Sequence, residues 1–228
     1  MKVELIAYTQ RPGAEPGQNP LSVVEQAACM CYDSKQTESN TVAKSCAKSG
    51  HTSVLEHISF TFQVSEVSRA LLAQLTRHRI ASYTVRSQRY CKERILNAVV
   101  PKAMKKNEYT EALYHNSLLS ASMFYNSLLD QHVPAEDARM VLPNACHTQL
   151  VVTMNARALI NASHERLCTR AQWEIRELFK QMKAAVGPVC PEVAEWMHPK
   201  CEEIPEYPFC RETKSCGRHP KLEEVYRK

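Results

Sequence analysis

Hydrophobic and polar residues repeat along this chain with two different periods, which together predict a mixture of strands and helices. A period of two residues, typical of strands, marks residues 2–8, 58–64 and 148–154. A period near 3.6, typical of helices, marks residues 21–32, 68–76, 108–131, 135–141, 156–167 and 171–186. Because strands and helices do not alternate strictly, the pattern predicts an α+β fold.

Local signals set the expected ends of several helices. Pro134 suits the first position of the helix at 135–141, and Asn155 suits the N-cap of the next helix. Gly187 and Pro188 are expected to end the last helix. Within 108–131, an apolar stripe is formed by Leu113, Leu118, Leu119, Phe124 and Leu128.

Length and composition favour one folded domain. The chain has 228 residues, 44% of them hydrophobic, which is enough apolar material for a core. We expect a single domain over residues 1–228, with an irregular, Cys- and Pro-rich C-terminal extension from about residue 188. No run reaches the ~20 apolar residues of a membrane span, and the N-terminal MKVELIAYTQ lacks a signal-peptide core. We therefore expect a cytoplasmic protein that binds no membrane and keeps its 10 cysteines reduced.

Glycine content and charge restrict the way in which nucleotides can be bound. With 5 glycines, the chain lacks a glycine-rich phosphate loop, so side chains must bind any nucleotide. The formal charge of +5 favours small anionic ligands but is weaker than that of a dedicated nucleic-acid binder. We expect small-molecule substrates and no nucleic-acid partner.

The segment from Arg77 to Tyr90, RHRIASYTVRSQRY, carries the strongest chemical signal. It joins arginines, a histidine, hydroxyls and tyrosines, and it contains no acidic residue. Unpaired cations are costly to bury, so the segment either lies open to water or binds an anion. The mixture fits a nucleotide phosphate with a ring beside it, and a solvated basic surface is the alternative.

Two smaller groups have a functional and an ordinary structural interpretation. His51, Ser53 and Glu56 can contact a ring, a ribose or a phosphate, but Ser53 and Glu56 also fit a helix capping box. Arg139 can bind an anion, or it can form a surface salt bridge of ~0.5 kcal/mol with Glu136, three residues earlier.

The helix that follows Asn155 presents polar side chains on two flanks. Arg157 and Asn161 share one face, and Arg166 and Arg170 share another. Asn161 and Arg166 are five residues apart, roughly 140° around a helix, so one small ligand cannot easily touch both. The helix therefore serves two ligands, or two subunits meet along it.

Six potential metal ligands lie near the C-terminus: Cys190, His198, Cys201, Cys210, Cys216 and His219. Zinc needs four N or S ligands, and the number is sufficient, but no Cys-x2-Cys spacing of a standard zinc motif occurs. We expect reduced structural thiols and no metal site, with zinc as the alternative.

Four segments, in this order, resemble the flavin-dependent thymidylate synthases: GHTSVLEHI, QLTRHRIASYTVRSQRY, AEDARMVLPNA and NARALINASHERLCTRAQWEIREL. The second contains the RHR-x7-S pattern of that family, and the resemblance runs from about Gly50 to about Glu177. It implies that family's α+β fold and a homotetramer whose active sites gather residues from several subunits. It also implies reductive methylation of deoxyuridylate (dUMP) to thymidylate (dTMP). The carbon donor would be 5,10-methylenetetrahydrofolate, and the hydride donor FAD reduced by NADPH.

The same resemblance assigns residues to the two main ligands. It implies a dUMP site of Gln74, Ser87, Gln88, Arg89, Arg139 and Arg166. Arg166 is the expected catalytic residue, because a permanently charged guanidinium can orient and activate the uracil ring. It implies an FAD site of His51, Ser53, Glu56, Arg77, His78, Arg79, Ile80, Asn155, Arg157 and Asn161.

Ser87 is the hydroxyl of the motif and a possible nucleophile for ring carbon 6. A serine nucleophile needs an adjacent base, and the neighbouring residues offer none, so we expect Ser87 to bind dUMP instead. Three positions depart from many relatives. Val85 and Gln88 replace a polar or acidic residue and a glycine, and Arg170 replaces a histidine that contacts the flavin.

Three other classes remain as alternatives to this enzyme. A nucleic-acid-binding module would use the basic segment and bind RNA with a steep salt dependence. A flavoprotein with another acceptor would bind FAD but not dUMP. A metal-stabilised structural protein would be identified by a metal assay.

Overall fold

The computed structural model describes residues 1–15, 17–204 and 206–225. The chain divides into two compact units, which are described separately. The first unit contains residues 1–2, 64–77 and 83–151, and the second contains residues 3–63, 78–82 and the described residues from 152 on.

The described residues form one four-stranded sheet in the order β1-β2-β4-β3. The strands are β1 (Lys2–Tyr8), β2 (Ser59–Ser68), β3 (Ser82–Val85) and β4 (His147–Asn155). Alternate residues of β2 and β4 are buried, as a strand with one covered face requires. Thr61 and Thr153 share a hydrogen bond of 2.9 Å between their hydroxyls, which pairs the two central strands.

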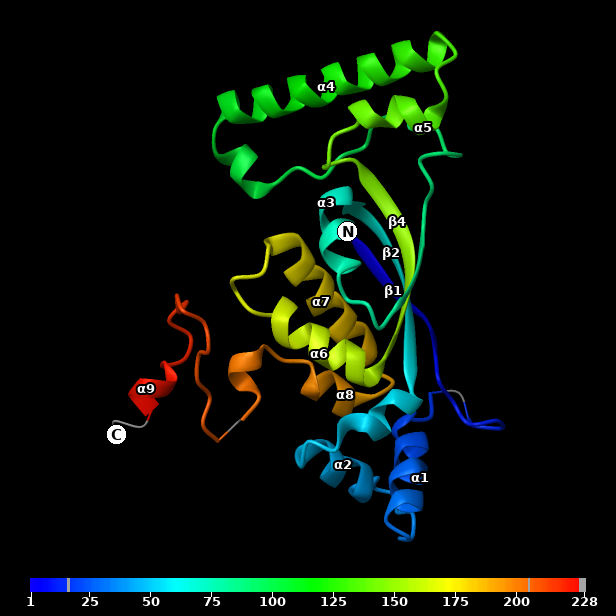
Figure 1. The fold of residues 1–228 in the computed structure, drawn as a ribbon, viewed down its shortest axis with the longest axis vertical. Helices are drawn as coiled ribbons and strands as arrows, with labels where there is room; N and C mark the ends of the chain where they lie inside the picture. The colour runs from blue at the N-terminus through cyan, green and yellow to red at the C-terminus, as the bar shows by residue number, and fades with distance from the viewer. Residues whose placement is uncertain (16, 205, 226–228) are drawn as a thin grey trace. The chain divides into compact units, whose positions relative to one another are not determined.

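The helices of the first unit are α3 (Arg69–Leu75), η2 (Lys102–Lys106), α4 (Glu108–Asp130), α5 (Ala135–Ala138) and η3 (Arg139–Val141). Figure 1 shows α4 beside α5, and Tyr125, Leu129 and Ala138 form the buried contact between them. Asn107 caps α4 by accepting a hydrogen bond of 2.9 Å from the Thr110 amide.

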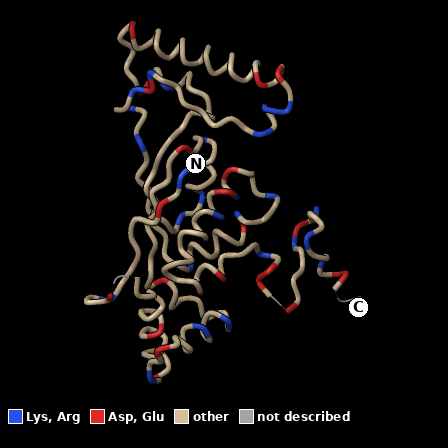
Figure 2. Tube along the Cα trace, turned by 180° about the vertical axis from the view of Figure 1, so that it is seen from behind, with Lys and Arg blue, Asp and Glu red and all other residues tan. Residues whose placement is uncertain are grey.

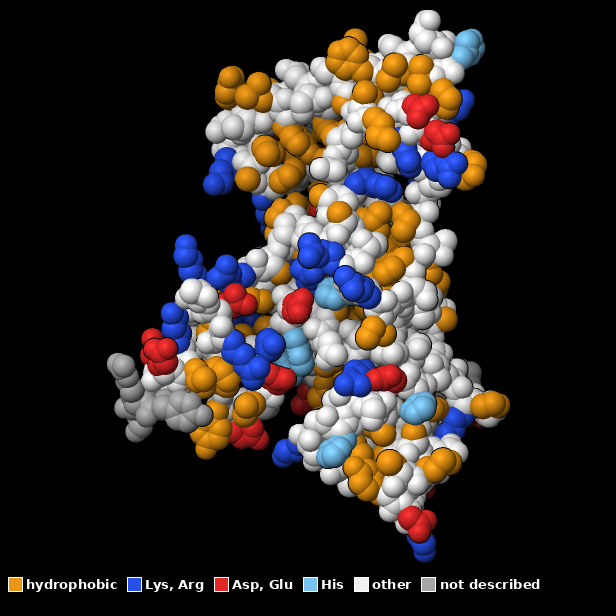
Figure 3. Space-filling view, viewed as in Figure 1, with side chains coloured by type: hydrophobic (Ala, Val, Ile, Leu, Met, Phe, Trp, Pro, Cys, Tyr) orange, Lys and Arg blue, Asp and Glu red, His pale blue; other side chains and the backbone are white. Residues whose placement is uncertain are grey.

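The apolar stripe predicted on α4 faces solvent only in part. Leu118 is half-buried, and Leu128 packs against the buried cluster of Tyr125, Leu129 and Ala138. Leu119 is 61% exposed and Phe124 is 65% exposed, and Leu113 and Met123 are exposed beside them. Figure 3 shows these hydrophobic side chains gathered over α4. Figure 2 shows no charged residue along the middle of the helix. The helix therefore carries two apolar faces, of which Tyr125 and Leu129 occupy the buried one.

The second unit contains the helices α1 (Leu21–Cys31), α2 (Thr41–Lys48), η1 (Thr52–His57), α6 (Ala156–Arg166), α7 (Trp173–Val186), α8 (Pro191–Trp196), η4 (Lys200–Glu202) and α9 (Leu222–Val225). Helix α6 packs against η1, α7, α8 and η4. Its Leu159 and the Phe179 of α7 are fully buried. Helix α6 is therefore the central element of this unit.

Most periodic segments were predicted with the correct type, and the α+β prediction is confirmed by the described residues. The prediction that 135–141 forms one helix was wrong, because the chain changes there from α5 to η3. Helix α2, strand β3 and helix α8 were not predicted. Pro134 occupies the N-cap position, one residue before the place expected for it. The single-domain organisation stays a prediction.

No helix in the described part of the chain combines the length and the apolar character that crossing a bilayer requires. All ten cysteines are free thiols in the structure.

Candidate active site

The basic segment begins where α3 ends and continues through a turn into β3. Within this turn Arg79 is exposed and Ile80 is 70% exposed. In the first unit, the Tyr83 hydroxyl donates a hydrogen bond of 2.9 Å to the Leu75 carbonyl, which ties the start of β3 to α3. Burial raises the pKa of Tyr83 to about 12, so this hydroxyl remains a donor at neutral pH. Arg79 and Ile80 are thus exposed in the turn between α3 and β3.

In the first unit, two arginines assigned to dUMP meet at one residue, Glu136. The Arg89 Nε lies 2.8 Å from the Glu136 Oε2, and the Arg139 Nε donates to the Glu136 carbonyl oxygen at 3.0 Å. The surface salt bridge considered for Arg139 is therefore replaced by a backbone contact. Because the Arg89–Glu136 pair is about half exposed on both sides, it is weak enough to exchange for a bound anion.

The remaining dUMP candidates of the first unit lie near the end of β3 and on α3. Ser87 accepts a hydrogen bond of 3.2 Å from the Arg89 amide, which positions the backbone of the motif. Gln88 is 7% exposed, and its amide donates to the Cys146 Sγ at 3.6 Å. The Gln74 amide donates to the Ala70 carbonyl at 3.3 Å. Of these three side chains, only that of Gln88 is buried.

The replacement of glycine by Gln88 causes no backbone strain in this structure. Among the described non-glycine residues, positive φ angles occur at Asp33, Asn40, Glu66 and His132, and not at Gln88. The conformational freedom of glycine is therefore not needed at this position.

In the second unit, the catalytic candidate Arg166 contacts His78 of the basic motif. The Arg166 Nε donates to the His78 Nε2 at 2.9 Å. His78 also packs against the ring of Phe179, with ring centroids 6.0 Å apart. Burial and the Arg166 cation lower the pKa of His78, while Glu165 partly opposes them. The imidazole is therefore neutral at pH 7 and accepts the hydrogen bond that orients the guanidinium.

The lowered pKa of His78 makes stability depend on pH. The unfolded imidazole takes up its proton at the ordinary value of 6.5, and the folded one only at lower pH. The contribution of His78 is therefore complete above pH 6.5 and is lost as pH falls through the folded-state pKa. We expect wild type to lose more unfolding free energy than His78→Gln between about pH 7.5 and about pH 5.5. Denaturant unfolding at both pH values measures this, and equal losses would contradict it.

Two FAD candidates of the second unit are joined by an ion pair across a long sequence separation. The Arg157 Nη1 contacts the Glu56 Oε1, and both side chains are about half exposed. No side chain caps η1 among the described residues, so the alternative of a Ser53–Glu56 capping box is not realised. Glu56 is instead held by α6.

Asn155 caps α6, as predicted, by accepting a hydrogen bond of 2.8 Å from the Ala158 amide. This cap fixes the start of the helix that carries Arg157 and Asn161. Asn161, His51, Ser53 and Arg77 are all exposed. The structure thus leaves these polar side chains available to a ligand.

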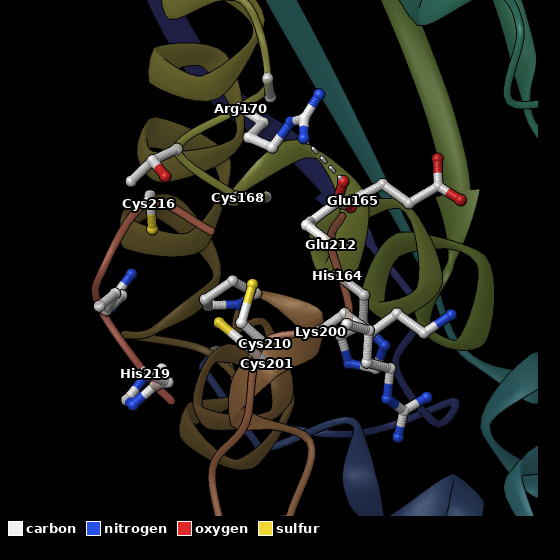
Figure 4. A pocket seen from close by; sticks show the side chains of 15 residues that line it. His164, Glu165, Cys168, Arg170, Lys200, Cys201, Cys210, Glu212, Cys216 and His219 are labelled. Carbon is white, nitrogen blue, oxygen red and sulfur yellow. Dashed lines mark ion pairs between the residues drawn. The ribbon is translucent and has the colours of Figure 1, made fainter. Parts of the chain in front are cut away.

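Arg170, one of the three departures, is engaged by the C-terminal segment. Its Nη1 lies 3.5 Å from the Glu212 Oε2 and donates to the Lys214 carbonyl at 3.2 Å. The ion pair between Arg170 and Glu212 is drawn in Figure 4. In this chain the position binds the protein's own tail.

Sequence reasoning missed the acidic partners of the motif arginines. Glu93 pairs with Arg86 at 3.1 Å and Glu136 pairs with Arg89, although the motif itself contains no acid. Glu93 lies three residues beyond Tyr90 and could have been found by widening the segment. The pairing of His78 with Arg166 has no sequence signal, because 88 residues separate them.

Comparisons with known proteins identify the family of this chain. Residues 4–192 match the family model described as "Thymidylate synthase complementing protein". A flavin-dependent thymidylate synthase of Clostridium tetani is 35% identical, over 99% of this chain and 97% of its own length. One of Geobacter sulfurreducens is 39% identical, over 100% of this chain and 98% of its own length. By the breadth of these matches, the chain belongs to the flavin-dependent thymidylate synthase family.

Proposed function

We propose that this chain makes dTMP from dUMP by reductive methylation, with 5,10-methylenetetrahydrofolate as carbon donor and NADPH as the source of electrons. The proposal rests on one observation: Arg89 and Arg139 both donate hydrogen bonds to Glu136. These two cations come from the second and third family-like segments, 50 residues apart in sequence. Guanidinium groups bind phosphate with directed hydrogen bonds, so the pair fits the phosphate of a nucleotide.

In this assignment Glu136 holds Arg89 until the phosphate arrives. The phosphate takes the place of the carboxylate at Arg89, and Arg139 supplies a second cation. Ser87 and Gln74 add polar contacts to the nucleotide. Gln88 acts by supporting the loop, because its side chain is buried against Cys146.

Arg166 is the residue that we assign to the uracil ring. Ring carbon 5 becomes a nucleophile when the ring takes on enolate character, with negative charge on a ring oxygen, before it attacks the carbon donor. A fixed guanidinium stabilises that charge. His78 keeps the guanidinium in place by accepting a hydrogen bond from its Nε–H. This role requires a neutral imidazole. Burial lowers the pKa of His78 and so keeps it neutral.

The residues of the second unit fit FAD by their chemistry. A dinucleotide diphosphate needs exposed cations, which Arg79 and Arg157 provide. Arg77, which the family resemblance also assigns to FAD, is exposed in the first unit. Glu56 can accept a ribose hydroxyl, and the exposed Ile80 offers an apolar contact to a ring. His51, Ser53, His78, Asn155 and Asn161 complete the proposed set. When bound, FAD supplies the hydride that completes the methyl group.

We expect Arg157→Ala to weaken FAD binding about 10–100-fold, by the loss of one to two charge-assisted hydrogen bonds. A titration of apoprotein with FAD, followed by flavin fluorescence, measures the dissociation constant. Arg94→Ala is the matched control, because Arg94 is also an exposed arginine paired with an acid, Asp130. Equal FAD affinity in Arg157→Ala and Arg94→Ala would remove Arg157 from the site.

We infer that the working enzyme is a homotetramer with active sites at subunit interfaces. The exposed apolar face of α4 supports this, because a helix that is apolar on two sides is usually covered on both. We also place the enzyme in the cytoplasm, where a reducing environment keeps its ten cysteines as free thiols.

The visible absorption spectrum tests the proposal most directly. Purified protein incubated with FAD should show bound flavin bands, and addition of dUMP should shift them. Flavin bands without a dUMP effect would favour a flavoprotein with another acceptor. Failure to bind FAD at all would overturn the proposal.

A further inference from the structure

Three potential metal ligands that are separated in sequence lie together in the C-terminal part of the second unit. Among the described residues, Cys201, Glu202 and His219 place donor atoms within 4.8 Å of one another. Cys201 and Glu202 come from η4, and His219 lies in an irregular segment before α9. All three are half-buried.

The backbone holds this group in place. The Cys210 amide donates to the Pro220 carbonyl at 2.7 Å, and Cys210 and Lys221 form a parallel β-bridge. The Glu202 Oε1 accepts from the Arg218 Nη2 at 2.9 Å and lies 3.3 Å from the His219 Nε2. These contacts hold Cys210 next to Pro220 and Lys221, the two residues that follow His219.

Two members of the cluster, Cys201 and His219, line a cavity of about 340 Å³ that further thiols also line. Cys168, Cys210 and Cys216 line this cavity with Cys201 and His219, as Figure 4 shows. The cavity therefore offers thiols beyond Cys201 that could complete a four-ligand site.

We propose that this cavity binds one Zn²⁺ ion through Cys201, Glu202 and His219, with Cys210 or Cys168 as the fourth ligand. Thiolate and imidazole ligands together favour zinc over magnesium or calcium, which prefer oxygen ligands. Zinc bonds of ~2.0–2.3 Å in a tetrahedral site place ligand atoms roughly 3.3–3.8 Å apart, so small side-chain movements suffice. An ion-pair network of Glu202, Arg218 and His219 accounts for two of the three clustered ligands, but it gives no role to Cys201 or to the other thiols of the cavity.

The ion would fasten the tail to the end of α6. Cys168 follows α6 directly, and Arg170, two residues later, pairs with Glu212 of the tail. With four protein ligands the site is structural, because a catalytic zinc keeps one position open for water or substrate. The expectation of a tail without metal came from sequence spacing, which cannot show ligands brought together by folding.

The test measures zinc in the full-length chain and in three variants. Protein freed of metal by a chelator is titrated with ZnCl₂ in competition with a chromophoric chelator. We expect one zinc per chain in wild type. Affinity should be at least about 100-fold weaker in Cys201→Ser and in His219→Ala, since even outer-shell partners contribute 10–100-fold. Cys31→Ser is the control, because Cys31 is an exposed thiol on α1 outside the cavity.

Thermal unfolding and cobalt binding provide a second readout that does not depend on enzyme activity. Zinc should raise the melting temperature of wild type and Cys31→Ser but not of Cys201→Ser. Co²⁺ should give a thiolate charge-transfer band that is lost in Cys201→Ser. The proposal would be overturned if the reduced wild-type protein failed to bind zinc stoichiometrically. FAD and dUMP binding are measured separately, so either proposal can fail alone.

Discussion

Arg166→Ala is expected to reduce kcat/KM for dUMP by about 10²–10³-fold, the usual loss when one charge-stabilising donor is removed. The guanidinium is the only assigned group whose contact strengthens as charge develops on the uracil ring. Its orientation depends on His78, because the His78 Nε2 accepts a hydrogen bond of 2.9 Å from the Arg166 Nε–H. Removing the side chain therefore removes both the charge and the geometry.

The measurement is the initial rate of dTMP formation over a range of dUMP concentrations, with bound flavin checked by absorbance. Arg166→Lys keeps the charge but loses the fork geometry, so it should recover only part of the activity. Arg94→Ala, which removes an arginine paired with Asp130, should retain wild-type activity. If Arg166→Ala bound flavin and kept near-normal kcat/KM, the catalytic role would belong to another residue.

The double variant Leu119→Asp with Phe124→Asp is expected to dissociate the proposed tetramer and abolish activity. Both side chains are more than half exposed on α4, so neither is needed for the fold of the single chain. In a subunit contact they would be buried, and burying unpaired carboxylates there costs several kcal/mol. Because the proposed active site takes residues from several subunits, dissociation should remove FAD binding as well.

Light scattering on a size-exclusion column gives the mass of the particle, and far-ultraviolet circular dichroism tests the fold. Lys35→Asp places the same charge on an exposed loop outside α4 and should leave the mass unchanged. A folded double variant with the same mass as wild type would show that this face of α4 is not a subunit contact.

The sequence alone determined the elements whose pattern is local. The strand at Lys2–Tyr8 was predicted with its observed ends, and α4 ends one residue before the predicted limit. These segments were readable because a strand or helix repeats its apolar residues at a fixed period. The Asn155 cap was readable because a cap joins residues three apart. The RHR-x7-S segment was likewise readable as contiguous residues.

The tertiary structure decided which side chains meet. Arg89 pairs with Glu136, Arg157 with Glu56 and Arg166 with His78. Cys201 meets His219 in the same way. It also decided that Leu113, Leu119 and Phe124 of α4 face outward, although the helix itself was predicted. No local rule reaches these outcomes, because a contact between distant residues depends on how the helices and strands pack around a shared core, and that packing is a property of the whole chain.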